Sequence, residues 1–448
     1  MFSHVIDSQF FCDLFSSAAM RAVFTDDQRL QKWLDFEAAL AQAEVTVGIV
    51  PEAAAAEITR KAHFALFDKA AIKQGMDKTA HPLVSVIWQL SNLCEGDAGG
   101  YVHWGATTQD VMDTGLALHL KDAHAIFLAT LDELIGTLSE LAARYRDQPM
   151  AGRTHGQQAL PITFGFKVAV WLAEVRRHKV RLEQAAERAL VGQFAGAAGT
   201  LAGVKEHGFI VNAKLMELLG LGVPIIGWHT ARDGFTEYAC DLAMIASTMG
   251  KIAHEIIDLQ KTEFGEVEEP FEMGKVGSST MPQKRNPMLC EAVLALARMA
   301  RPLATVALDA MHHEHERDWS SVQMEWAYLP ELCNYVHGAM VMTQRILAGL
   351  IVYPHNMERN LHASGGLLLA ERVMLALGKQ IGRQHAHDII YEVAMEAFES
   401  RRAFSELLKQ RAEVTAHLTP EQIDELLNPV MYLGLAAEYV DRVLRDEK

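Results

Sequence analysis

The chain has 448 residues, half of them hydrophobic, so it is long enough for two or three domains with a large core. Its formal net charge of −16 argues against nucleic acid or an anionic membrane as a partner, because both require a basic protein surface. An anionic substrate would therefore have to be bound by a local cluster of hydrogen-bond donors.

Cysteine usage and the N-terminus predict a cytoplasmic protein. The five cysteines are scattered and form no CxxC pair, which favours reduced thiols over disulfides or a zinc site. The first residues contain no basic region, and Asp7 and Asp13 interrupt the apolar stretch, so we expect no secretory leader. No apolar run reaches the ~18 residues needed to span a bilayer. The nearest, residues 292–311, is broken by Arg298 and Arg301.

Long amphipathic helices are predicted through the middle of the chain. The first is marked by apolar residues at steps of three and four, which form one stripe on a helix: Leu116, Leu120, Ala123, Phe127, Leu131, Leu134, Leu138, Leu141 and Tyr145. Similar patterns predict further helices at residues 164–191, 238–259, 287–311 and 322–351. Prolines are absent between Pro161 and Pro224 and between Pro224 and Pro270, as long helices require.

Alternating strand patterns are rare, so the predicted fold class is all-α. We expect an N-terminal helical domain at residues 1–105, a central five-helix bundle at 106–353 and a C-terminal helical domain at 354–448. Further apolar residues lie off the main stripes and are expected at contacts between subunits: Ile126, Leu128, Trp171, Leu172 and Met244.

Two polar loops each precede a predicted long helix. Thr107, Thr108 and Gln109 lie before the first helix, where free N–H groups at a helix N-terminus can bind an anion; the alternative is that the threonines only cap the helix. The stretch "GRTHGQQALP", residues 152–161, brings Thr154, His155 and Gln157 before the second helix. The alternative for His155 is a purely structural role.

A third polar loop, "GSSTMPQKRNP", spans residues 277–287 and precedes the helix predicted near Pro287. Its composition excludes a helix, while Lys284 and Asn286 offer a charge and amide donors. Three helix starts with anion-binding groups predict a carboxylate-binding pocket if folding or assembly brings them together.

The third loop resembles the signature Gly-Ser-Ser-x-Met-Pro-x-Lys-x-Asn of the fumarase/aspartase superfamily. The first two loops resemble its other signature regions, in the same chain order. The resemblance implies a homotetramer with a core of bundled helices, in which loops of three subunits build each active site and no metal or cofactor is needed. It also implies that the third loop closes over the substrate.

The resemblance also implies roles for individual residues. Ser278 would remove a proton next to a substrate carboxylate, and Lys284 and Asn286 would stabilise the doubly charged aci-carboxylate intermediate. His155 would protonate the leaving group or hold the acid in place. The remaining candidates would bind the small anionic carboxylate substrate: Thr107, Thr108, Gln109, Thr154, Gln157, Ser279 and Arg317.

Within the superfamily, two activities compete. The stretches "WHTARD" (residues 228–233), "MEW" (324–326) and the late "YLG" resemble 3-carboxy-cis,cis-muconate cycloisomerase, which is the favoured function. His155 and "GEVEEPF" (265–271) instead resemble carbon–nitrogen lyases, which eliminate an amine from an N-succinyl compound and release fumarate. A third alternative, an inactive helical scaffold, is disfavoured because the predicted catalytic residues are all retained.

Two features of the sequence limit the kinds of ligand that the protein can bind. Adenylosuccinate lyases carry a phosphate-binding arginine nine positions after the arginine of "HERD"; counted from Arg317, that position is Trp326, whose single N–H cannot hold a phosphate dianion. The run "HHEHER" contains His312, His313 and His315, but adjacent histidines on a helix point apart, so we predict no metal site.

Overall fold

The computed structural model describes residues 4–271, 280–281 and 283–446. Helices dominate this part of the chain, which confirms the all-α class. Six of them precede the central region: α1 (Cys12–Phe15), α2 (Ala18–Val23), α3 (Asp26–Val45), α4 (Glu52–Lys61), α5 (Lys69–Thr79) and α6 (Val84–Leu93). Within the described residues, no helix is both long and apolar enough to cross a bilayer.

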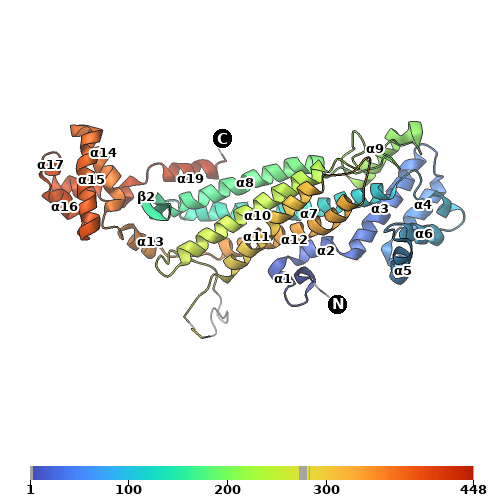
Figure 1. Cartoon of the computed structure of the whole chain (residues 1–448), viewed down its shortest axis with the longest axis horizontal. Coiled ribbons are helices and arrows are strands. Elements are labelled where there is room, and N and C mark those ends of the chain that lie inside the picture. The colour runs from blue at the N-terminus through green and yellow to red at the C-terminus, as the bar shows by residue number, and fades with distance from the viewer. Residues whose placement is uncertain (1–3, 272–279, 282, 447–448) are drawn as a thin grey trace. The chain divides into compact units, whose positions relative to one another are not determined.

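The five long helices expected in the middle of the chain are present (Figure 1). They are α7 (Thr108–Arg144), α8 (Phe164–Ala189), α10 (Asp233–Gln260), α11 (Met288–Asp309) and α12 (Ser320–Ala348). A shorter helix, α9 (Gly208–Leu219), lies between α8 and α10 in the sequence. Most predicted boundaries lie within five residues of these, because apolar periodicity is a local property of the sequence. One expectation is corrected: α7 begins at Thr108, so Thr108 and Gln109 are its first two residues and do not precede it.

The apolar stripes of these helices form the core. On α7, the predicted stripe residues from Leu116 to Leu141 are all buried. The apolar stripe of α10 is no more than 2% exposed at any of its seven positions: Tyr238, Leu242, Ile245, Met249, Ile252, Ile256 and Leu259. Hydrogen bonds join the helices where polar groups are enclosed. The Tyr238 hydroxyl of α10 lies 3.1 Å from His124 Nδ1 of α7, and the Thr236 hydroxyl of α10 donates to the Ala307 carbonyl of α11 over 3.0 Å.

Two off-stripe residues correct an expectation. Trp171 and Leu172 were expected at contacts between subunits, but both are buried within the single chain, with exposed fractions of 4% and 0%. Met244 remains 41% exposed. More of the apolar surface of α8 is therefore buried within one chain than the sequence pattern predicted.

The chain divides into two compact units. Unit 1 comprises residues 1–131, 177–250 and 292–341, and unit 2 comprises residues 132–176, 251–291 and 342–448. Each of the five long helices contributes residues to both units. The predicted three-domain division at residues 105 and 353 stays a prediction.

The remaining α-helices of the described residues belong to unit 2. They are α13 (Pro354–Leu361), α14 (Ala370–Ile381), α15 (Arg383–Ser400), α16 (Phe404–Gln410), α17 (Ala412–Thr415), α18 (Pro420–Leu426) and α19 (Ala436–Leu444). Side chains from α14 to α18 form a separate hydrophobic cluster that includes Val373, Ile390 and Phe404. This cluster gives the C-terminal helices a core of their own.

Two short antiparallel strand pairs accompany the helices. β1 (Pro149–Thr154) pairs with β2 (Gln157–Thr163), and β3 (Val267–Glu268) pairs with β4 (Ile351–Val352). The β1–β2 hairpin was not expected from the sequence. It contains the whole second polar loop, so the candidate residues of that loop lie on a hairpin rather than at a helix N-terminus.

Candidate active site

The first polar loop is fixed to α7 by Asp110, whose side chain is fully buried. The Thr107 N–H donates to Asp110 Oδ2 over 3.0 Å, and the same carboxylate accepts N–H groups of Ala195 at 3.1 Å and Gly196 at 3.0 Å. His229 Nε2 lies 2.8 Å from Asp110 Oδ1. Asp110 thus positions Thr107 together with the loop that contains Ala195 and Gly196. This carboxylate was not identified from the sequence.

A cavity of about 310 Å³ opens beside the start of α7 within unit 1. It brings together four of the predicted residues: Thr107, Thr108, Gln109 and Arg317. Arg317 Nη1 donates to the Thr107 hydroxyl over 3.3 Å, and Nη2 donates to the Ala197 carbonyl over 2.8 Å. Both acceptors are neutral, so no carboxylate of the described residues compensates the guanidinium charge. That charge is available to an anionic ligand.

His81 also lines this cavity and was missed by the sequence analysis. Its Nδ1 accepts the N–H groups of Leu83 and Val84 over 3.4 and 3.2 Å, and its Nε2 lies 3.2 Å from the Thr108 hydroxyl. Burial lowers the pKa of His81, and the neighbouring His103 lowers it further. The ring is therefore neutral with its proton on Nε2, which makes it a donor toward Thr108.

Gln109, predicted to bind substrate, has a different environment. Its side chain is buried, and its amide nitrogen donates to Asp113 Oδ2 over 3.1 Å and to the His229 carbonyl over 3.0 Å. Asp113 in turn pairs with Arg232. Because both amide protons are used inside the protein, Gln109 supports the wall of the cavity rather than offering donors to a ligand.

The second polar loop forms the tip of the β1–β2 hairpin in unit 2. Thr154 pairs with Gln157, so His155 and Gly156 are the two central turn residues, with φ of 52° and 74°. Positive φ at both positions is required by a type I′ turn, and a non-glycine residue in this region is uncommon. All four residues are exposed. The predicted start of the second long helix is confirmed, since α8 begins at Phe164, but the polar residues expected directly before it lie on the hairpin instead.

The His155 imidazole forms no hydrogen bond or ion pair with the described residues. Strained backbone conformations concentrate at functional sites, where surrounding structure holds them. In this hairpin, Arg153 makes the contacts that hold the turn in place. Its guanidinium makes two hydrogen bonds to the buried Glu266 carboxylate, of 2.9 and 2.8 Å, and lies 4.6 Å from the centre of the Phe264 ring. In the sequence, this pair was indicated only by the opposite charges of Arg153 in "GRTHGQQALP" and Glu266 in "GEVEEPF".

The third polar loop is described only in part. Ser278 and Ser279, the predicted base and a binding residue, lie outside the described residues. Lys284 is exposed and forms no ion pair with the described residues, and its N–H donates to the Met281 carbonyl over 3.0 Å. The Asn286 carbonyl accepts the Met288 N–H over 2.9 Å, directly before α11.

The N-terminus of α11 is already occupied by a carboxylate of this chain. Glu269, 2% exposed, accepts the N–H groups of Leu289 and Cys290 over 3.0 and 3.1 Å. The N–H groups at this helix start were expected to bind an anionic substrate. Because Glu269 satisfies them, the positive end of this helix helps to hold the "GEVEEPF" segment. Anion binding by this loop therefore rests on its side chains.

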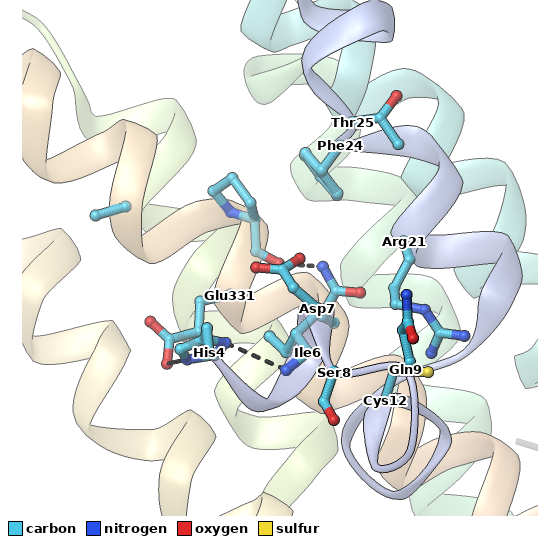
Figure 2. Close-up of a pocket in the computed structure, with 13 residues that line it drawn as sticks. His4, Ile6, Asp7, Ser8, Gln9, Cys12, Arg21, Phe24, Thr25 and Glu331 are labelled. Carbon is cyan, nitrogen blue, oxygen red and sulfur yellow. Dashed lines mark hydrogen bonds and ion pairs between the residues drawn. The ribbon is translucent and has the colours of Figure 1, made fainter. Parts of the chain in front are cut away.

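A cavity of about 470 Å³ lies at the N-terminal segment, apart from the predicted residues (Figure 2). Two acids, Asp7 and Glu331, line it together with Arg21, which already pairs with Asp13 over 2.6 Å. None of the predicted site residues that the structure describes lines this cavity. Its mixed charges fit no carboxylate-binding role.

The histidine run after α11 was expected on a helix, but it lies in a loop. His313 is directed to Asp318, with 3.2 Å between Nδ1 and Oδ2. Burial lowers the pKa of His313. Arg317 and Trp319, which follow in the same loop, line the cavity beside α7.

Comparisons with known proteins give the following similarities. Residues 15–301 match the lyase family, and residues 366–443 match the adenylosuccinate lyase C-terminus family. The chain is 43% identical to an N-acetyl-S-(2-succino)cysteine lyase of Enterococcus italicus, over 99% of this chain and 97% of that protein. It is 42% identical to a 3-carboxy-cis,cis-muconate cycloisomerase of Pseudomonas aeruginosa, over 99% and 97%. The structure of the 3-carboxy-cis,cis-muconate lactonizing enzyme from Pseudomonas putida superimposes with a TM-score of 0.91 at 38% identity, covering 98% of this chain and 99% of that one.

Proposed function

Because this chain belongs to the lyase family and is an enzyme of the fumarase/aspartase superfamily, we propose that it cleaves a 2-succinyl conjugate and releases fumarate. The observation that carries this proposal is His155, which is exposed at a hairpin turn with neither ring nitrogen bonded to the described residues. A free imidazole is suited to protonate a departing atom. Lactonisation expels no such atom.

The reaction is a β-elimination. Ser278 removes a proton from the succinyl methylene carbon, and Lys284 and Asn286 stabilise the charge that develops on the adjacent carboxylate. The electron pair forms the new carbon–carbon double bond while the bond to sulfur or nitrogen breaks. The departing atom takes a proton from His155, so the products are fumarate and a thiol or an amine.

The substrate carboxylates are bound by groups of the three polar loops and of the loop after α11: Thr107, Thr108, Thr154, Gln157, Ser279 and Arg317. The enzyme is a homotetramer whose active sites are shared between subunits. It acts in the cytoplasm, and its free cysteines agree with a reducing compartment.

Two observations bear on the leaving group. The Enterococcus italicus relative is named for a thioether of succinate, N-acetyl-S-(2-succino)cysteine, which makes sulfur our first choice for the departing atom. Trp326 occupies the position of the phosphate-binding arginine of adenylosuccinate lyases, which disfavours a nucleotide. A small thiol or amine therefore fits better than a nucleotide amine.

The second candidate is the cycloisomerase, which the sequence alone favoured. The Pseudomonas aeruginosa relative and the Pseudomonas putida structure support it. In this reaction a carboxylate of 3-carboxymuconate adds across the substrate's own double bond through a similar carbanion. Several bacterial cycloisomerases carry tryptophan at position 155, so His155→Trp would retain lactonisation but not elimination.

The test is a substrate panel followed by ultraviolet absorbance, with 3-carboxymuconate, adenylosuccinate, argininosuccinate, S-(2-succino)cysteine and its N-acetyl form. We expect fumarate release from a 2-succinyl conjugate. His155→Ala should lower kcat by about 10²–10⁴-fold, whereas the exposed His385→Ala should leave it unchanged. Conversion of 3-carboxymuconate alone, with His155→Trp active, would select the cycloisomerase.

A further inference from the structure

The cavity beside α7 has a polar side and an apolar side. Arg317, His81 and Thr108 contribute polar groups, while Trp319 and Met112 contribute apolar surface. Pockets of a few hundred Å³ with a small number of convergent polar groups are typical of small-molecule sites. The Trp319 indole is 39% exposed, so part of its surface can contact a ligand.

The orientation of Trp319 is set by a second tryptophan. Its ring centre lies 5.4 Å from that of Trp326, at an interplanar angle of 85°, which is a favourable edge-to-face arrangement. Trp326 is itself held between Trp33, at 6.4 Å, and the guanidinium of Arg29, at 5.7 Å from its ring centre. The residue at the position of the phosphate-binding arginine therefore supports an aromatic wall.

The charges of the cavity select among ligands. Among its described lining residues, Arg317 carries the only formal charge, since His81 is neutral and no aspartate or glutamate contributes. A ligand carboxylate gains a charge-assisted hydrogen bond from Arg317. A free ammonium group finds no carboxylate partner and is repelled by the guanidinium, whereas an acylated amine is neutral and can lie against an indole face.

We infer that Trp319 determines leaving-group specificity, and that the departing half of the substrate is an N-acylated amino acid thiol or amine with a single carboxylate. This inference rests on the proposed function and extends it to one residue and one chemical class. Arg317 binds the carboxylate of the leaving group, and the acyl group packs on the Trp319 indole. Removing the aromatic surface reduces discrimination between acylated and free-amine conjugates.

The experiment compares fumarate release from N-acetyl-S-(2-succino)cysteine and S-(2-succino)cysteine. For the wild type we expect kcat/KM to favour the acetylated substrate by about tenfold or more. Trp319→Gln should bring this ratio close to one, mainly through a higher KM for the acetylated substrate. Trp319→Phe, which keeps an aromatic face, should retain most of the preference and shows that the site tolerates substitution. The exposed Trp88→Gln on α6 is the matched control and should keep the wild-type ratio.

The outcomes separate the two claims. If wild type releases fumarate from both substrates equally, or if Trp319→Gln keeps the wild-type ratio, the inference about Trp319 is wrong and the proposed function stands. If wild type releases fumarate from neither of these substrates nor from the nitrogen-linked conjugates of the panel, the proposed function is wrong. Calorimetry with N-acetyl-S-methylcysteine and S-methylcysteine then decides: tighter binding of the acetylated compound that Trp319→Gln abolishes sustains the inference, and equal binding overturns it.

Discussion

Arg153 and Glu266 lie 113 residues apart in the sequence and form a two-point ion pair, with Nη1–Oε2 and Nη2–Oε1 distances of 2.9 and 2.8 Å. The Glu266 side chain is fully buried and also accepts a 2.8 Å hydrogen bond from Asn360. The pair fixes the end of β1 two residues before His155. The position of the proposed acid therefore depends on a contact between distant segments of unit 2.

Glu266→Gln should impair both stability and catalysis. It leaves the Arg153 guanidinium without its carboxylate in a partly enclosed site, which costs about 3 kcal/mol of unfolding free energy. Displacement of His155 should lower kcat by up to about 10²-fold. Denaturant unfolding and steady-state kinetics measure the two effects, with the exposed Glu263→Gln as control. Wild-type kinetics in Glu266→Gln would show that the pair does not position the turn.

Arg232→Met should strongly destabilise unit 1. Arg232 is buried between Asp113, at 2.8 and 3.0 Å, and Glu325. Burial lowers the pKa of Arg232, but the two carboxylates raise it by more, so the guanidinium stays charged. Removing it leaves two buried carboxylates without a cation, which costs about 3–5 kcal/mol.

Denaturation midpoints at a fixed protein concentration test this prediction. The control is Arg188→Met, which removes an exposed ion pair with Glu237 in the same unit and should change the midpoint little. Equal shifts for the two variants would contradict a special role of the buried network.

Glu44 should make stability depend on pH. It is fully buried in α3, and neither carboxylate oxygen has a hydrogen-bond partner among the described residues. Burial, together with the nearby Glu37, raises the pKa of Glu44 from 4.5 to about 9. The unfolded chain loses this proton near pH 4.5, whereas the folded chain keeps it until about pH 9. The unfolding free energy therefore falls as the pH rises between these values.

Glu44→Gln removes this titration. Relative to wild type, the variant should gain up to about 1.4 kcal/mol of stability per pH unit across this window. Unfolding midpoints between about pH 5 and pH 8 measure the trend. The exposed Glu52→Gln of α4 should show none. A constant difference between Glu44→Gln and wild type would mean that the folded protein accommodates the ionised carboxylate.

Subunit complementation tests the proposal that active sites are shared between subunits. Ser278→Ala and His155→Ala should each reduce kcat by orders of magnitude while the circular-dichroism spectrum stays unchanged. After mixing and verified subunit exchange, some sites combine an intact Ser278 from one chain with an intact His155 from another, and part of the activity should return. Failure to recover activity would indicate that each site is built from a single chain.

The helical architecture could be predicted without knowledge of the fold. The spacing of apolar residues in α7 and α10 lies within each helix, so it predicts the helix and its buried face without knowledge of any partner. The signature-like loop similarly indicated the superfamily, because its residue types follow one another directly in the chain.

The local environment of the candidate site, in contrast, becomes visible only in the folded chain. Arg153 of the hairpin that carries His155 pairs with Glu266, and the N-terminus of α11 is occupied by Glu269, which lies 20 residues before Leu289. His81 joins the cavity beside α7 through its contact with Thr108, 27 residues away. Such contacts leave no periodic trace in the sequence, because each is a single pairing between segments that folding brings together.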